Sequence, residues 1–104
     1  MSGQPAVERR PIRIHYVGLL PSGDVFEKSK DSAPLKFRLG RGEVIKGWDI
    51  GIQGMRVGGK RRIMCPPAAA YGAAKVQGDP KKGTKDIPPN STLTFIVTLI
   101  EAKV

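Results

Sequence analysis

Gly40-Arg41-Gly42-Glu43-Val44-Ile45-Lys46-Gly47-Trp48-Asp49-Ile50-Gly51 is the stretch of sequence that decides the fold. It places the only tryptophan of the chain one helical turn after an apolar pair, between glycines. An apolar stripe at helical spacing is formed by Ile45, Trp48, Ile52 and Met55. The spacing therefore predicts a helix over residues 44–55. Each glycine in it costs about 1 kcal/mol relative to alanine, so we expect packing to hold this helix.

Alternating apolar and polar residues predict strands before and after this helix. The clearest alternation is that of Leu93, Phe95, Val97 and Leu99 with the residues between them, and further strands are predicted from Ile12 onward, over 35–39 and over 60–65. Residues 27–33 are predicted to form a loop or bulged edge, and residues 72–90, rich in Gly, Pro and Lys, a long exposed flap. Antiparallel strands around one short helix make an α+β domain in which the helix covers the sheet.

The length of 104 residues fits one compact domain, which we place at residues 11–104 after a disordered leader at residues 1–10. The chain contains no run of the ~18 apolar residues needed to cross a bilayer and no signal-peptide stretch. We therefore expect no membrane contact and an intracellular location, cytoplasmic or nuclear. The single cysteine, Cys65, excludes an internal disulfide, and its uncharged neighbours indicate a buried, inert thiol.

Eighteen basic side chains against nine acidic ones give a net charge of +9. Such a charge attracts polyanions, so nucleic acid and acidic protein segments are candidate partners. The basic residues form three clusters: Arg9 with Arg10 and Arg13, Lys60 with Arg61 and Arg62, and Lys81 with Lys82 and Lys85. Each cluster is short enough to be simply a solvated surface, and the sequence leaves that alternative open.

Several catalytic classes are excluded by missing residues. Residues 54–60 spell G-x-x-x-x-G-K, but Arg61 follows where a phosphate-binding loop needs Ser or Thr. His15 is the only histidine and has no metal-ligand spacing around it, and no G-x-S-x-G nucleophile motif is present. We therefore expect neither a metal nor a cofactor, and no covalent catalysis.

Two further segments accompany the tryptophan stretch: His15-Tyr16-Val17-Gly18 followed by Phe26-Glu27, and Pro67 to Gly72 with the pattern P-x-x-A-Y-G. Together the three segments resemble the FKBP family of peptidyl-prolyl cis/trans isomerases, the macrolide-binding immunophilins, over about residues 12–102. The resemblance implies an antiparallel half-barrel sheet wrapped around one short helix. It also implies a monomeric isomerase without cofactor, which acts on X-Pro bonds of peptides or proteins and binds rapamycin-type macrolides.

The aromatic and aliphatic residues of these segments predict an apolar pocket that suits a prolyl ring. We assign catalytic roles to Tyr16, Phe26, Glu27, Trp48, Tyr71 and Phe95, and ligand binding to Leu35, Glu43, Val44, Ile45 and Ile87. The resemblance implies that Trp48 forms the pocket floor, while the Ile45 N–H and the Tyr71 hydroxyl hold ligand carbonyls. Phe37 is assigned to the core.

Glu27 stands where the family pattern has aspartate. We expect its extra methylene to displace the carboxylate from a hydrogen bond to the Tyr16 hydroxyl, and so to reduce activity. Two functions remain open from the sequence. One is a prolyl isomerase; the other is a binding module on the same fold, with weak or no isomerase activity, which docks nucleic acid or acidic partners through its basic surface.

Overall fold

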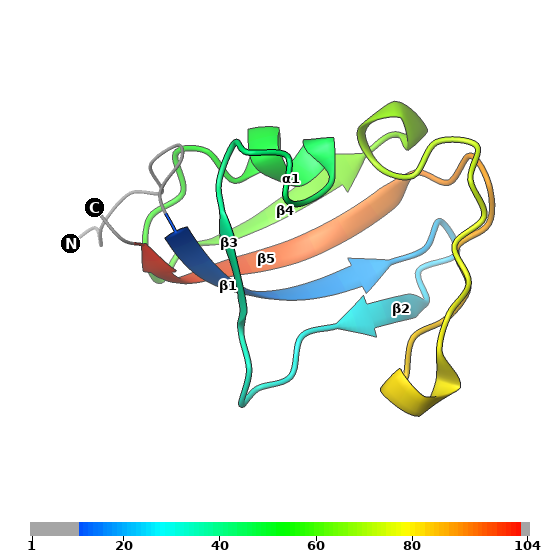
Figure 1. Cartoon of the computed structure of the whole chain (residues 1–104), viewed down its shortest axis with the longest axis horizontal. Helices are drawn as coiled ribbons and strands as arrows, with labels where there is room; N and C mark the ends of the chain where they lie inside the picture. Colours follow the sequence, from blue (N-terminus) through cyan, green and yellow to red (C-terminus); the bar gives the residue numbers. More distant parts are fainter. Residues whose placement is uncertain (1–10, 103–104) are drawn as a thin grey trace.

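The computed structural model describes residues 11–102, so the predicted leader at residues 1–10 lies outside the described residues. Within these residues, five strands form one antiparallel sheet, and one short α-helix packs on it (Figure 1). The elements are β1 (Pro11–Leu19), β2 (Val25–Lys28), β3 (Leu35–Arg38), α1 (Lys46–Gly51), β4 (Lys60–Cys65) and β5 (Leu93–Ala102), with short 3₁₀ turns η1 (Pro67–Ala69) and η2 (Pro80–Lys82). The predicted α+β class is confirmed.

The strand order β2-β1-β5-β4 leaves one edge of β1 shared between two partners. β3 pairs with residues 11–14 of β1, and β2 pairs with residues 17–19 of the same strand. The chain between β2 and β3 swings away from the sheet (Figure 1). Tyr16 therefore lies where β1 changes partner, and its backbone N–H donates to the Ser29 hydroxyl at 2.9 Å.

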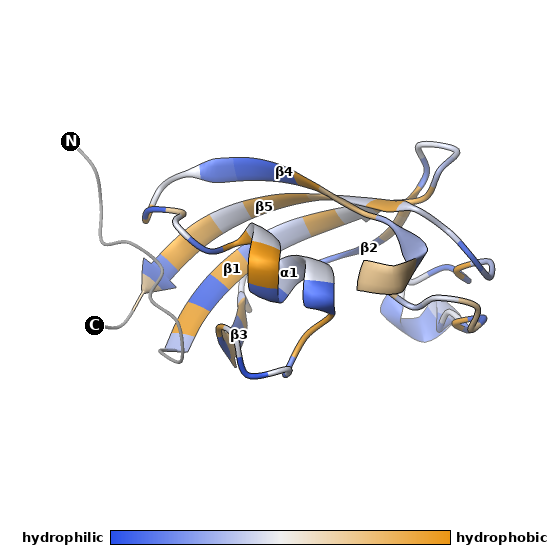
Figure 2. Cartoon of the chain, turned by 90° about the horizontal axis from the view of Figure 1, so that it is seen from above, coloured by the Kyte–Doolittle hydropathy of each residue, from blue (hydrophilic) through white to orange (hydrophobic). Residues whose placement is uncertain are grey.

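The core lies between the sheet and α1. Alternate residues of β5 are buried, and Figure 2 shows the matching bands of hydrophobic and polar residues along β1 and β5, with α1 on one face. Trp48, Ile52 and Met55 from the helical segment join the core residues of the sheet, which include Ile12, Ile14, Ile63, Leu93, Phe95, Val97 and Leu99. The predicted apolar stripe thus covers the sheet as expected.

The helix is shorter than the predicted range 44–55. It begins at Lys46, because Ile45 is extended with φ −59° and ψ 151°, and it ends at Gly51. Gly51 also allows the helix to approach β4 closely: a Cβ on Gly51 would lie 2.8 Å from Cγ2 of Ile63. As predicted, packing holds this glycine-rich helix.

The structure refines two loop predictions. Of the predicted loop or bulged edge at residues 27–33, Glu27 and Lys28 belong to the edge strand β2, whose register with β1 shifts between Gly18 and Leu19, and the loop begins at Ser29. The segment 72–90 is exposed for much of its length but is not a free flap, because Val76 and Ile87 form a β-bridge and the Lys85 N–H donates to the Phe26 carbonyl at 2.9 Å. Within residues 11–102, no helix has the length and apolar character needed to cross a bilayer.

Candidate functional site

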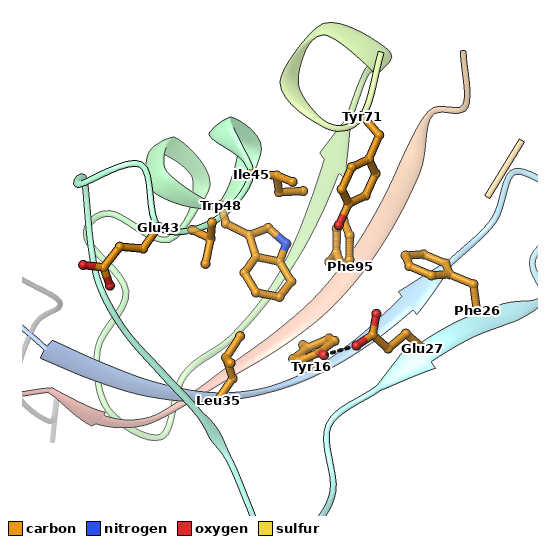
Figure 3. A pocket seen from close by; sticks show the side chains of 10 residues that line it. Tyr16, Phe26, Glu27, Leu35, Glu43, Ile45, Trp48, Tyr71 and Phe95 are labelled. Carbon is orange, nitrogen blue, oxygen red and sulfur yellow. Dashed lines mark hydrogen bonds between the residues drawn. The ribbon is translucent and has the colours of Figure 1, made fainter. Parts of the chain in front are cut away.

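A cavity of about 280 Å³ opens between α1 and the edge where β2 and β3 leave β1 (Figure 3). Ten of the eleven residues assigned to the site from the sequence line it: Tyr16, Phe26, Glu27, Leu35, Glu43, Val44, Ile45, Trp48, Tyr71 and Phe95. The exception is Ile87, which is 3% exposed and belongs to the core. Its bridge to Val76 draws it inward, so it stabilises the loop rather than lining this cavity.

Trp48 forms the base of the cavity and is only 5% exposed. The rings of Tyr16 and Phe95 meet it edge-on, with centroids 4.9 Å and 5.0 Å from its own. Phe26 packs edge-on against Phe95 at 5.7 Å, and Phe37 reaches Trp48 from the core side at 6.1 Å. Such interlocked aromatic pairs favour fixed ring positions, so the cavity wall is preformed.

Glu27 keeps its hydrogen bond to Tyr16, contrary to our expectation. The Tyr16 hydroxyl donates to Oε2 of Glu27 at 2.7 Å, as Figure 3 shows. Glu27 is opposite Gly18 in the β1–β2 register, and Tyr16 is the diagonal neighbour on the same face. The longer side chain spans this diagonal, so the prediction that glutamate misplaces the carboxylate is wrong.

Gly18 shapes the cavity in a way that the sequence analysis missed. A Cβ at this position would lie 2.6 Å from Cζ of Phe26 and 3.0 Å from Cε1 of Phe95. A side chain here would therefore displace the two rings that form the wall. The only signal in the sequence was a glycine inside a strand, which often marks a close approach of another group.

Asp49 is a second positioning residue that the sequence analysis missed. Its carboxylate accepts hydrogen bonds from the N–H groups of Gly40 and Gly42, both at 2.9 Å. This clamp holds the loop that carries Glu43, Val44 and Ile45 to the cavity. An acidic residue in the first turn of a helix was the available signal, but its partners lie outside the helix.

Tyr71 leans over the cavity from the turn that follows η1. Gly72, with φ +59°, reverses the chain there, and its N–H donates to the Pro67 carbonyl at 2.8 Å. Tyr71 remains 40% exposed. Within residues 11–102 its hydroxyl and the Ile45 N–H make no hydrogen bond. Two donors at the cavity are thus available to ligand carbonyls.

Neither phenol ionises easily. Burial, then the hydrogen bond to Glu27 and its charge, raises the pKa of Tyr16 well above its ordinary value. Burial, followed by the charge of Glu27, also raises the pKa of Tyr71. Both hydroxyls therefore act as neutral hydrogen-bond donors near neutral pH. Cys65 is buried as predicted, and burial raises the pKa of its thiol.

The residues of the basic clusters differ in how far their side chains are available to a partner. The Arg61 guanidinium donates to the carbonyls of Gly51 at 2.7 Å and Gln53 at 2.9 Å, so this residue caps the end of α1 instead of facing a partner. Lys60 and Arg62 are exposed, and so are the flap lysines Lys81, Lys82 and Lys85. Within the described residues, no group of three or more His, Cys, Asp or Glu could hold a metal ion.

A family model described as FKBP-type peptidyl-prolyl cis-trans isomerase matches residues 3–100. The chain belongs to the FKBP family. The crystal structure of AtFKBP13 has the same fold, with a TM-score of 0.83 and 42% identity over 97% of this chain and 85% of that one. The peptidyl-prolyl cis-trans isomerase from Pseudomonas syringae pv. tomato gives a TM-score of 0.76 and 35% identity over 96% of this chain and 67% of that one.

Two curated relatives extend the comparison of this FKBP domain. The FK506-binding protein 4 of Mycosarcoma maydis is 48% identical over 98% of the chain, and the peptidyl-prolyl cis-trans isomerase of Saccharomyces cerevisiae is 46% identical over 97%. The chain covers only 25% and 23% of the lengths of these two proteins. The likeness therefore concerns one domain of larger proteins.

Proposed function

We propose that this FKBP domain is a peptidyl-prolyl cis/trans isomerase that acts on X-Pro bonds and binds rapamycin-type macrolides. The observation that carries the proposal is a preformed aromatic cavity at whose mouth two hydrogen-bond donors, the Ile45 N–H and the Tyr71 hydroxyl, are unpaired within residues 11–102. The name of the Saccharomyces cerevisiae relative supports the same activity.

Isomerisation of an X-Pro bond breaks no covalent bond and needs no proton transfer. Its barrier of ~18–20 kcal/mol is mostly the amide resonance that is lost in the twisted state. In that state the carbonyl is less polarised than in the planar amide, so it depends less on hydrogen-bonding water. A water-poor, apolar cavity then favours the twisted state over the planar one, and each ~1.4 kcal/mol of this preference gives a tenfold higher rate.

The residues of the cavity have different roles in substrate binding. The indole face of Trp48 receives the prolyl ring, with Phe26 and Phe95 as side walls. The Tyr71 hydroxyl and the Ile45 N–H donate to carbonyls on either side of the proline and orient the bond that rotates. The hydrogen bond from Tyr16 to Glu27, at 2.7 Å, fixes the Tyr16 ring against Trp48.

Macrolide binding can be measured by the fluorescence of Trp48, the only tryptophan. We expect rapamycin to quench this fluorescence in the parent, and Tyr71→Phe to weaken binding by about one hydrogen bond, on the order of 1 kcal/mol. Lys60→Gln, on the exposed outer side of β4, serves as the control and should bind as the parent does. A parent that shows no saturable quenching, or a Tyr71→Phe variant with unchanged affinity, would contradict this assignment.

A second function is supported by the charge. We also propose that the basic surface docks nucleic acid or an acidic protein, because Lys60 and Arg62 project from the exposed side of β4 and neither forms an ion pair within residues 11–102. The test is a salt titration of DNA affinity for the parent and for Lys60→Glu with Arg62→Glu. The charge-reversed variant should bind more weakly and with a shallower salt dependence. Equal slopes would exclude this surface.

A further inference from the structure

A second hollow, of about 360 Å³, adjoins the apolar cavity. The two share Tyr16, Glu27 and Leu35, so they lie on either side of one wall. The charged groups that line the second hollow, besides Glu27, are the lysines Lys28, Lys30, Lys36 and Lys82, and we call this feature the lysine groove. A peptide chain that leaves the apolar cavity over the shared wall enters the lysine groove.

The backbone that carries these lysines is held in place from several sides. Lys28 belongs to β2, Lys36 to β3, and Lys82 to η2. The η2 turn is capped by Asp79, whose Oδ1 accepts from the Lys81 N–H at 2.9 Å. The Lys85 N–H ties the same loop to β2 through the Phe26 carbonyl at 2.9 Å. Segments far apart in the sequence are thus fixed around one hollow.

The positive charge of the lysine groove is not neutralised by the described part of the chain. None of its four lysines forms an ion pair within residues 11–102. Two nearby acids are engaged elsewhere: Asp79 caps η2, and Oδ1 of Asp86 accepts from the Gly78 N–H at 2.7 Å. Glu27, the one acid in the lining, accepts from Tyr16. Four lysines against one carboxylate leave the lining with a net positive charge, and a hollow with such a lining concentrates ligands of the opposite sign.

We propose that the lysine groove selects proline-containing segments with Asp or Glu side chains a few residues from the proline. This inference rests on the proposed function, since it assigns a substrate class to the same site. A polypeptide is favoured over nucleic acid because the groove continues a cavity shaped for a prolyl ring. Tyr16 is also the only aromatic residue that residues 11–102 contribute to its lining, whereas single-stranded nucleic acids are bound on several stacking platforms.

The size of the effect follows from the exposure of the lysines. All four are exposed, so each carboxylate contact contributes no more than a typical surface ion pair. Two such contacts give about a 3- to 10-fold preference in kcat/KM at low salt. The preference should shrink as salt rises, because exposed charges are screened.

The experiment compares two peptides with the same Leu-Pro centre, one with a pair of Glu residues two and three positions from the proline and one with Gln at those positions. Both placements of the pair, before and after the proline, are tested. Isomerisation is followed by NMR, and binding by the fluorescence of Trp48. The parent should prefer a Glu peptide, and Lys36→Glu with Lys82→Glu should abolish or reverse this preference while the Gln peptide reacts as before.

Arg41→Glu with Lys75→Glu is the matched control, because it changes the net charge by the same amount at two exposed residues that line neither hollow. It should keep the preference for Glu. Equal kcat/KM and affinity for both peptides in the parent would overturn the inference, and so would an equal loss in both variants. If a single-stranded oligonucleotide binds more tightly than the Glu peptide, and if Lys36→Glu with Lys82→Glu abolishes that binding, the groove is a nucleic-acid site instead and the inference is overturned. If no peptide is isomerised, the proposed function fails, and the fluorescence affinities still decide for or against the lysine groove.

Discussion

Replacing Glu27 by aspartate shortens the side chain that holds Tyr16 in place. The bond between the Tyr16 hydroxyl and Oε2 of Glu27 measures 2.7 Å, and removal of one methylene withdraws the carboxylate by about one C–C bond, ~1.5 Å. The separation would become about 4 Å, which is too long for a hydrogen bond. β2 cannot follow freely, because Val17 pairs with Lys28 and Gly18 with Glu27 in the β1–β2 register.

A hydrogen bond to a charged group contributes about 1.5–3 kcal/mol. Tyr16 and Glu27 are both only half-buried, so water replaces part of the lost bond and we expect a loss of about 1 kcal/mol. For a domain of this size that loss lowers Tm by ~4–8 °C. Isomerase turnover should fall too, since the Tyr16 ring that borders Trp48 loses its anchor. This outcome is opposite to the gain in activity that the sequence alone suggested for aspartate.

The measurement is a pair of urea titrations, for Glu27→Asp in the parent and in a Tyr16→Phe background. With the hydroxyl already absent, the same change at Glu27 should cost nearly nothing, so the two effects should differ by about 1 kcal/mol. Equal losses in both backgrounds would show that the hydrogen bond is not the cause. If Glu27→Asp leaves the stability of the parent unchanged, the argument from the length of the side chain is refuted.

Four further predictions follow from the same site. Gly18→Ala should cost about 1–3 kcal/mol, because its Cβ would lie 2.6 Å from Cζ of Phe26; an unchanged Tm in a thermal melt would contradict this packing. Trp48→Ala should abolish the binding of a fluorescently labelled macrolide and cost about 3–5 kcal/mol of stability. Circular dichroism must first show that the variant is folded, and retained affinity for the macrolide would contradict the assignment of Trp48 to the cavity floor. Turnover should stay constant between about pH 7 and about pH 9, because the raised pKa values of Tyr16 and Tyr71 keep both hydroxyls protonated. The ordinary pKa of tyrosine is 10.0, so above about pH 10 the unfolded chain loses tyrosine protons that the folded chain retains, and stability falls as pH rises. This fall should be less steep in Tyr16→Phe. Equal slopes of stability against pH for parent and variant would contradict the raised pKa of Tyr16.

Much of the fold was predictable because its signals are local. The alternation of β5 and the stripe of Ile45, Trp48, Ile52 and Met55 each report one buried face directly. The helix limits were not predictable to the residue. Ile45 continues the helical apolar pattern, but it is extended because the preceding loop is clamped by Asp49, and this clamp depends on partners seven and nine residues away.

Ten of the eleven residues assigned to the site line the cavity, the roles assigned to them stay predictions, and Gly18 and Asp49 were missed. Ile87 was assigned to the cavity, but the bridge to Val76 places it in the core, and no local pattern in a Gly- and Pro-rich segment reveals such a pairing. The prediction that Glu27 loses its hydrogen bond to Tyr16 was wrong for a similar reason, because this bond depends on the register of two strands. The lysine groove was invisible in the sequence, where Lys28, Lys36 and Lys82 are scattered over three segments.

The central claim is that an aromatic cavity without acid, base or metal chemistry isomerises X-Pro bonds. The most direct test measures cis/trans exchange of a Leu-Pro peptide by NMR, with a catalytic amount of the purified chain, with and without rapamycin. We expect exchange well above the uncatalysed rate, which has a time constant of tens to hundreds of seconds at 25 °C, and a return to that rate when one equivalent of rapamycin fills the cavity. Exchange that stays at the uncatalysed rate, or acceleration that persists with the cavity filled, would contradict the account.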